Sequence, residues 1–241
     1  MNSFYLHIFA MFCMLLDHSW GMGLLKNDIF TCIGRLAFPI FAFMIVEGYF
    51  KTSNLKRYVG RLFIFAIISE IPYNLMIGDS IFNPYSQNVF WTLLIGLGLI
   101  YLIERVKNRR LYVRIPVIGL CLFLGFFLGL IGMTDYNFAG VYMILVFYFF
   151  RGHKWYHFVG QLICLWYINV ELLAGLDYVI PIGEYTFYLT RQGLALLSLI
   201  PIWLYNGKQG YYNKYIKYFY YSFYPLHILI LYGIKLLYSF F

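Results

Sequence analysis

Residues 11–23 read "MFCMLLDHSWGMG", an apolar run that closes on two adjacent ionisable side chains, Asp17 and His18. An apolar run of this kind predicts a membrane-crossing helix. Ionisable groups at membrane depth are costly, and they usually face a bundle interior, a water-filled cavity or a partner. The stretch therefore predicts a helical membrane protein that carries a polar site inside its first span.

The composition of the whole chain supports this fold class. Of the 241 residues, 62% are hydrophobic and 12% are charged, and the mean hydropathy is +0.72. Soluble domains carry about 25% charged residues. The sequence predicts an all-α, polytopic transmembrane helical bundle that forms one domain over residues 1–241. The N-terminal segment has no basic n-region and no small-residue cleavage site, so we expect the first span to be retained.

Gly, Pro, Asn and charge clusters divide the chain into about nine expected spans, within a range of eight to ten. They cover residues 4–21, 29–50, 58–77, 88–104, 113–132, 136–150, 155–173, 187–205 and 218–238. The stretch 174–186 is left as a candidate re-entrant piece.

The basic residues fall in alternate loops. Thirteen of the 18 Lys and Arg residues follow the second, fourth, sixth and eighth spans: Lys51, Lys56, Arg57, Arg105, Lys107, Arg109, Arg110, Arg114, Arg151, Lys154, Lys208, Lys214 and Lys217. The opposite loops carry acids: Asp28, Asp79, Asp135, Glu171, Asp177 and Glu184. By the positive-inside rule the N-terminus is cytoplasmic, in a multi-pass protein of the cell (inner) membrane. The net charge of +8 then reflects topology, and nucleic acid is not an expected partner.

One face of the first span carries two histidines. His7, Met11, Met14 and His18 follow the spacing i, i+4, i+7, i+11. Eleven residues place His7 and His18 roughly 16 Å apart along the helix axis. Asp17 points about 100° away from His18, so we expect its partner on another helix, such as Arg35.

The second and third spans bring further charges into the bundle. Pro39 cannot donate a hydrogen bond to the carbonyl of Arg35, so a kink is expected there. Pro72 predicts another break. Glu70 lies at the level of Asp17 and Arg35, which makes an Asp17–Arg35–Glu70 network around His18 geometrically possible.

Several of these features have a purely structural interpretation. Glu47 can pair with Lys51 at i+4, and buried ion pairs often only join helices. The aromatic runs "YYNKYIKYFYYSFY" and "FYFF" are typical of interfacial belts rather than of a ligand cage. We expect the four cysteines to be buried structural thiols, because their spacing is not that of metal ligands: Cys13, Cys32, Cys121 and Cys164.

Several motifs resemble the TraX family of membrane proteins. They include "GRLAFPIFAF" at 34–43, "RLFIFAIISEIPYNL" at 61–75, "NVFWTLLIGLGL" at 88–99, "TDYNFAGVY" at 134–142 and "FYPLH" at 223–227. The family is linked to N-terminal acetylation of conjugative pilin, and it is similar to the wider acyltransferase-3 group. Those relatives carry a basic residue, ten further residues and then a histidine. This pattern falls on His7 and His18, with histidine in place of the more usual Lys or Arg.

The resemblance implies an acetyl-CoA-dependent N- or O-acyltransferase without a metal. His18 would be the general base, aided by Asp17, Arg35, Glu70 and His227. The acyl-CoA would lie against His7, Lys51, Lys56, Arg57 and Arg61. The acceptor, an exported or envelope protein N-terminus or glycan, would meet Asn88, Asp135 and Tyr136. Covalent acyl-histidine and direct transfer both remain open.

Two other classes of function fit the same residues. Carboxylates and histidines at mid-depth also form the proton relays of transporters. A non-catalytic envelope assembly factor is the third alternative, and it predicts that a His18→Ala variant stays functional.

Overall fold

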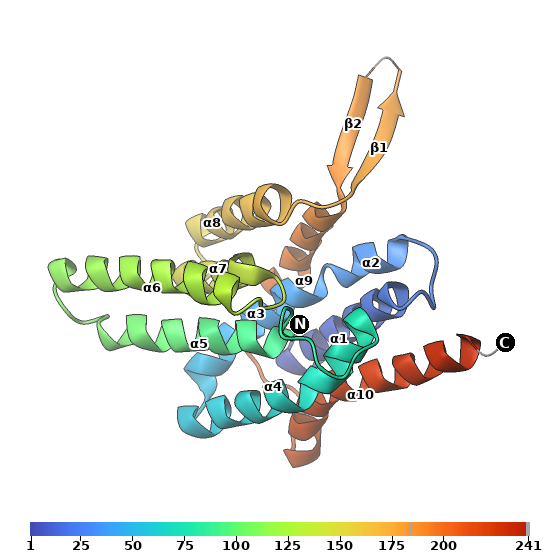
Figure 1. The fold of residues 1–241 in the computed structure, drawn as a ribbon. Coiled ribbons are helices and arrows are strands. Elements are labelled where there is room, and N and C mark those ends of the chain that lie inside the picture. The colour runs from blue at the N-terminus through green and yellow to red at the C-terminus, as the bar shows by residue number, and fades with distance from the viewer. Residues whose placement is uncertain (184, 240–241) are drawn as a thin grey trace.

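The computed structural model describes residues 1–183 and 185–239, a bundle of helices from which one β-hairpin projects (Figure 1). The α-helices are α1 (Ser3–Gly21), α2 (Ile29–Gly34), α3 (Ala37–Lys51), α4 (Leu55–Gly78), α5 (Val89–Arg105), α6 (Leu111–Ile131), α7 (Asn137–Phe149), α8 (Trp155–Trp166), α9 (Leu199–Trp203) and α10 (Lys214–Ser239). A π-helix (Tyr167–Leu172) continues α8, and a 3-10 helix (Arg191–Ser198) precedes α9.

Asparagine side chains define the start of three helices. Asn2, Asn54 and Asn88 accept hydrogen bonds from amides of the first turns of α1, α4 and α5, at 3.1, 2.9 and 3.1 Å. These amides have no partner within their own helix, so capping stabilises each start. The expected first, third and fourth spans therefore begin within three residues of their predicted positions.

Among the described residues, three helical stretches are long and apolar enough to cross a membrane. They are Ile29–Lys51, Leu55–Gly78 and Leu111–Ile131, with mean hydropathies of 2.1, 1.3 and 2.2. Most of the remaining expected spans also form helices, but these are shorter or more polar. The membrane character of the chain rests on these three stretches.

The two prolines behave differently. The helical path breaks at Arg35 and Leu36, between α2 and α3, which confirms the kink expected from Pro39. The break expected at Pro72 is wrong, because α4 continues through this residue to Gly78. Long helices of membrane proteins tolerate an internal proline where neighbouring groups satisfy the freed carbonyl.

The region 174–190 is the main departure from an all-helical fold. Strands β1 (Asp177–Ile182) and β2 (Tyr185–Thr190) pair antiparallel, with Ile182 opposite Tyr185. Gly183 between them has a φ of 63°, in the left-handed region that favours glycine. The expected re-entrant piece and the start of the expected span 187–205 are therefore this hairpin. Glu184, one of the expected outer acids, lies outside the described residues.

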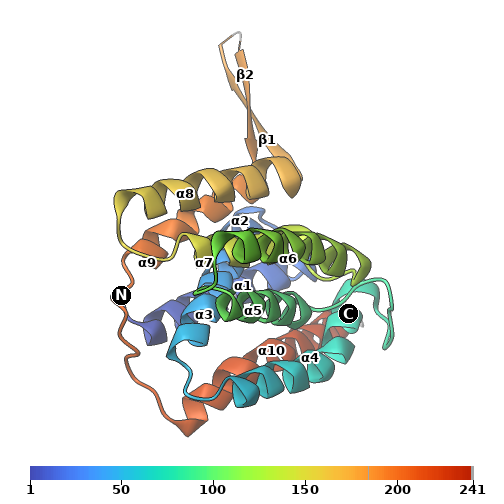
Figure 2. The same cartoon turned by 90° about the vertical axis from the view of Figure 1, so that its left-hand side faces the viewer.

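The base of the hairpin is fixed to α2. The Tyr178 hydroxyl lies 3.2 Å from Cys32 Sγ, and Arg191 forms a 2.7 Å ion pair with Asp28. Beyond this base the arm is exposed; Tyr188, for example, is 68% exposed. The hairpin thus starts at the bundle and leaves it (Figures 1 and 2).

The loops gather at two ends of the bundle. At one end, which we call the basic end, Lys51 Nζ donates to the Gly207 carbonyl at 2.7 Å, and Ser3 N–H donates to the Lys208 carbonyl at 2.9 Å. At the other, the acidic end, the loop 79–88 pairs with the loop 132–136, and Lys235 of α10 forms a 2.8 Å ion pair with Asp79. The basic and acidic loops therefore lie apart (Figure 2).

The core lies where α3, α5 and α7 meet. Ile40, Ile100 and Ile144 are fully buried there. Gly96 of α5 lets α7 approach closely, since a Cβ at this position would lie 2.6 Å from Ile144 Cδ1. This rigid centre leaves the faces of α1, α3 and α10 to enclose the cavities described next.

Candidate functional site

Two cavities lie along the axis of the bundle. The larger cavity, of about 620 Å³, is at the acidic end, and the smaller cavity, of about 280 Å³, is at the basic end. Four residues line both of them: Met14, Phe41, Val89 and Tyr224. We call these four residues the shared wall. The cavities thus approach each other from opposite ends and are separated by one layer of side chains.

His18 lies in the larger cavity and is held by His227. The His18 Nδ1 and His227 Nε2 atoms are 2.7 Å apart, and the two rings stack with centroids 4.9 Å apart. His227 Nδ1 lies 2.7 Å from the Phe223 carbonyl, which can only accept a hydrogen bond. In neutral His227, Nδ1 therefore carries the proton and Nε2 accepts one from His18 Nδ1. The chain of bonds leaves the lone pair of His18 on Nε2.

We expected a carboxylate to orient the His18 ring, and the structure differs from that expectation. The family resemblance implied that role for Asp17 or Glu70. The imidazole of His227 fills it instead, since α10 places His227 directly against α1. His227, expected as a second candidate for proton transfer, is thus adjacent to His18.

Asp17 binds the kinked region of the second expected span. The Thr31 hydroxyl donates to Asp17 Oδ1 at 2.7 Å, and Arg35 Nη2 lies 2.9 Å from Thr31 Oγ1 and 3.7 Å from Asp17 Oδ1. The expected pairing of Asp17 with Arg35 is present in the structure. Gly34 makes it possible, because a Cβ there would lie 2.3 Å from Asp17 Cβ.

Glu70 does not join this network. It accepts hydrogen bonds from the Asn88 side chain and from Trp91 Nε1, the latter at 2.7 Å. The expected Asp17–Arg35–Glu70 network is therefore wrong, and Glu70 joins α4 to α5. Asn88 is fully buried and also bonds the Ala66 carbonyl at 2.8 Å. Asn88 does not line the larger cavity, so this geometry does not support its expected place at the acceptor mouth.

Asp135 and Tyr136, in contrast, line the larger cavity as expected. They belong to the loop before α7, where the Tyr136 ring stacks on Phe38 at 4.1 Å. Burial raises the pKa of Asp135 to about 6, the charge of Asp17 adds to this rise, and Arg35 opposes it. Burial in this environment favours the neutral, protonated form of the carboxyl.

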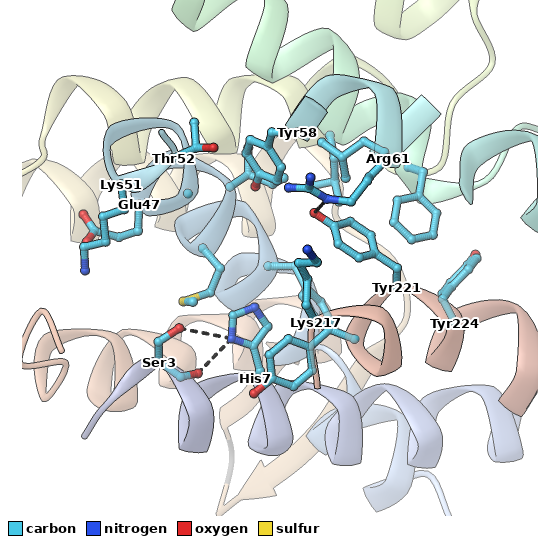
Figure 3. A pocket seen from close by; sticks show the side chains of 18 of the residues that line it. Ser3, His7, Glu47, Lys51, Thr52, Tyr58, Arg61, Lys217, Tyr221 and Tyr224 are labelled. Atoms are coloured by element: carbon cyan, nitrogen blue, oxygen red, sulfur yellow. Dashed lines mark hydrogen bonds and ion pairs between the residues drawn. The ribbon is translucent and has the colours of Figure 1, made fainter. Parts of the chain in front are cut away.

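The smaller cavity is basic and rich in tyrosine (Figure 3). Its charged lining residues are the cations Lys51, Arg61 and Lys217 and the carboxylate Glu47. Glu47 already pairs with Lys51 at 3.0 Å, as the i+4 spacing predicted, and with Arg151 at 2.8 Å. The cavity thus has a surplus of positive charge, which favours an anionic ligand.

His7 lies near the mouth of this cavity (Figure 3). Its Nδ1 is 2.8 Å from the Ser3 carbonyl, and its ring stacks on Tyr220 with centroids 4.2 Å apart. Arg61 donates to the Tyr221 hydroxyl at 3.4 Å. His7, Lys51 and Arg61 therefore share one cavity, as the sequence suggested for the donor site.

Lys56 and Arg57 do not line the smaller cavity. Both are exposed on the first turn of α4. Lys56 points away from the face of Arg61, whereas Arg57 shares that face but lies one turn nearer the start of the helix, outside the cavity. Their expected role at the donor site is not supported by this geometry.

Sequence analysis missed Lys217 and the tyrosines of the cavity. Lys217, Tyr220, Tyr221 and Tyr224 follow the spacing i, i+3, i+4, i+7 and form one face of α10. Expecting this run to form an interfacial belt was therefore wrong for that face. The helical spacing was the signal that could have identified it. Among the described residues, no group of three His, Cys, Asp or Glu side chains is arranged to hold a metal ion.

Comparison with known proteins gives two matches. Residues 4–235 match the family model described as "TraX protein". A protein of Dichelobacter nodosus named "Probable fimbrial assembly protein FimC, serogroup H1" is 27% identical over 247 residues, covering 98% of this chain and 96% of that protein. No solved structure matches the chain. The matched residues include the shared wall, His18 and His227.

Proposed function

The chain belongs to the TraX family, and on that premise we propose that it is a membrane acyltransferase. It moves an acetyl group from acetyl-CoA in the smaller cavity to an amine or hydroxyl of an acceptor in the larger cavity. The observation that carries the proposal is the pair of opposed cavities that meet at one wall, with His18 beside it.

The larger cavity supplies the chemistry. Acyl transfer requires a base that takes the proton of the acceptor as it attacks the thioester. His18 Nε2 carries the available lone pair, and His227 holds the ring through Nδ1. Arg35 and Asp17 line the same cavity as this base, while Asp135 and Tyr136 contact the acceptor.

The smaller cavity supplies the donor site. Coenzyme A carries phosphate groups and an adenine ring at one end and a narrow thiol-bearing arm at the other. Lys51, Arg61 and Lys217 complement the phosphates, the tyrosines complement the adenine ring, and the arm extends toward the shared wall.

Membrane topology follows from the charge pattern. The basic end lies in the cytoplasm, where acetyl-CoA is made, and the acidic end faces outward, in a multi-pass protein of the inner membrane with about nine spans. The acceptor is a pilus protein or another envelope molecule, in keeping with the fimbrial assembly named for the relative.

A second candidate function is favoured by that same name. A fimbrial assembly protein can act by holding pilus components without chemistry. The two candidates differ in whether the chain turns over acetyl-CoA and whether His18 is needed for activity.

The test uses purified full-length protein in detergent with radiolabelled acetyl-CoA. The wild type should bind acetyl-CoA and hydrolyse it slowly, or transfer the label to a peptide amine. The His18→Gln variant should lose about 10²–10⁴-fold in rate, as expected for removal of a general base. The matched control is His153→Gln, since His153 is exposed and lies outside both cavities.

Two outcomes would contradict the proposal. Folded wild-type protein that neither binds nor turns over acetyl-CoA would favour the assembly role. Equal rates for wild type and His18→Gln would remove His18 from the chemistry. Proton-driven flux in liposomes would instead indicate a transporter.

A further inference from the structure

Tyr224 occupies a special position in the shared wall. Among the described residues, six have a buried side-chain polar atom without a hydrogen-bond partner, and of these only Tyr224 lines both cavities. Its side chain is 4% exposed, and the atom without a partner is the phenol oxygen. The amide of Val89 lies near this oxygen without meeting hydrogen-bond geometry.

An unpartnered buried hydroxyl lowers the stability of a fold, because the group has lost water and gained nothing in return. The Tyr224 ring is already well held, with its edge against Phe90 at 5.4 Å between centroids. Phenylalanine would fill the same space without that loss. The hydroxyl therefore indicates a ligand that is present at another stage of the working cycle.

The surroundings of Tyr224 indicate which ligand. The His18 ring lies edge-on to it at 5.8 Å between centroids. Figure 3 shows Tyr224 at the far end of the smaller cavity from Lys51 and Ser3. A thioester whose phosphates lie near Lys51 would bring its acyl carbonyl toward the shared wall, within reach of both His18 and Tyr224.

We propose that the Tyr224 hydroxyl donates a hydrogen bond to the acyl carbonyl oxygen and stabilises the oxyanion that forms there. This inference rests on the proposed function, and it adds the electrophilic half of the site that the histidines do not supply. Met14, an unbranched side chain in the same wall, is the member that moves aside when the thioester enters.

The step balances with the residues named. The acceptor nitrogen or oxygen attacks the carbonyl carbon while His18 Nε2 takes its proton, and the carbonyl π electrons move to the oxygen beside Tyr224. The oxyanion then reforms the carbonyl, the carbon–sulfur bond breaks, and its electron pair leaves on sulfur. The coenzyme A thiolate takes the proton from His18. Tyr224 only donates a hydrogen bond and ends the cycle unchanged.

The test is Tyr224→Phe in the full chain, which removes the hydroxyl and keeps the ring. We expect kcat to fall about 10²–10³-fold, the usual loss for one oxyanion donor. The Kd for coenzyme A should stay within about threefold, because the anionic end binds elsewhere. The Tm should stay unchanged or rise, because an unsatisfied group has been removed. The matched control, Tyr232→Phe, lies two turns along α10 and outside both cavities, and it should leave all three values unchanged.

If the Tyr224 hydroxyl had only a structural role, its loss would lower the Tm or weaken coenzyme A binding. A lower kcat with unchanged or higher Tm and unchanged coenzyme A binding therefore distinguishes the proposed role. The inference is wrong if Tyr224→Phe keeps a third or more of the wild-type kcat while the wild type is active and His18→Gln is not. It is also wrong if lower activity comes with a lower Tm and lost coenzyme A binding. An inactive wild type would remove the proposed function and this inference together.

Discussion

The two cavities differ in how their polar side chains are held. The smaller cavity is lined by three long cationic side chains, Lys51, Arg61 and Lys217, and its carboxylate Glu47 leaves a surplus of positive charge. In the larger cavity the polar side chains are bonded to one another, as in the Asp17–Thr31–Arg35 cluster, and His18 is held by His227. Flexible cations suit binding of a charged ligand, whereas chemistry needs groups held in fixed positions. Each prediction below tests whether this division is real.

The largest expected effect comes from forcing apart the network of the larger cavity. In Gly34→Ala the new Cβ would lie 2.3 Å from Asp17 Cβ, so α1 and α2 have to separate. Because misplacement of about 1 Å can reduce a rate about 10²-fold, we expect a loss of that size in transfer. Coenzyme A binding at the other end should stay within about twofold, as measured by equilibrium binding.

The control for this change is Gly98→Ala on the exposed face of α5. A Cβ there meets no atom within 4 Å, and alanine is favoured over glycine in a helix by roughly 0.5–1 kcal/mol. This variant should keep its activity and unfold at a slightly higher temperature. Full activity in Gly34→Ala would show that the Asp17 cluster does not position the site.

A smaller effect is expected from the cavity of flexible cations. Lys217→Gln removes one of its three cations and should weaken coenzyme A binding about 3–10-fold, which corresponds to one net hydrogen bond of about 1 kcal/mol. The kcat at saturating donor should be unchanged, since Lys217 lies about two helical turns before Tyr224 on α10 and does not line the larger cavity. Lys107→Gln, on the exposed loop beside Glu104, is the matched control for a lost positive charge.

The same binding measurement distinguishes a basic residue that lines the smaller cavity from one that is only close to Lys51 and Arg61 in the sequence. Lys56→Gln should leave the Kd for coenzyme A within about twofold, because Lys56 lies outside the smaller cavity. If Lys56→Gln lowered the affinity for coenzyme A as much as Lys217→Gln does, the donor site would instead lie at the loop after α3.

The smallest expected effect is a pH-dependent change in the stability of the fold, caused by Asp135. Burial raises the pKa of Asp135 to about 6, above the usual value of about 3.9. Between these pH values the folded protein keeps a proton that the unfolded chain has released, so stability falls as the pH rises through that window. Asp17, Arg35, Tyr136 and His18 all face the same cavity.

Replacing Asp135 by Asn removes this penalty. We expect a Tm about 2–4 °C higher than that of the wild type at pH 7.5, corresponding to about 1 kcal/mol in a chain of this size. The gain should shrink as the pH falls below 6 and vanish at about pH 3, where the wild-type carboxyl is largely protonated in both states. A gain that does not depend on pH would assign the effect to packing instead.

The sequence predicted features that depend on the residues of a single helix. The apolar runs identified most helices, Pro39 predicted the break before α3, and the i+4 spacing predicted the pair of Glu47 with Lys51. The side of α1 shared by His7 and His18 also lies along both cavities, one residue in each. These features depend on local periodicity and on backbone hydrogen bonding.

The sequence did not predict contacts that depend on how two helices pack against each other. The choice of Asn88 and Trp91 as partners for Glu70 depends on how α4 is rotated against α5, which no pattern within one helix contains. The contact of His227 with His18 likewise depends on where α10 crosses α1.

The hairpin was missed for a different reason. An apolar membrane chain makes every apolar run look helical, and this outweighed the β-branched and aromatic residues of 177–190. The glycine between the two strands was the local signal of a turn.

The shared wall also has an electrical consequence. On the proposed topology, water entering the bundle from both ends would place most of the transmembrane voltage across the four side chains between the cavities. A full charge that crosses 100 mV exchanges about 2.3 kcal/mol with the field, whereas a neutral acetyl group exchanges none. An energised membrane would therefore leave the passage of the acetyl group unaffected, and the same thin layer would have to keep protons from leaking through it.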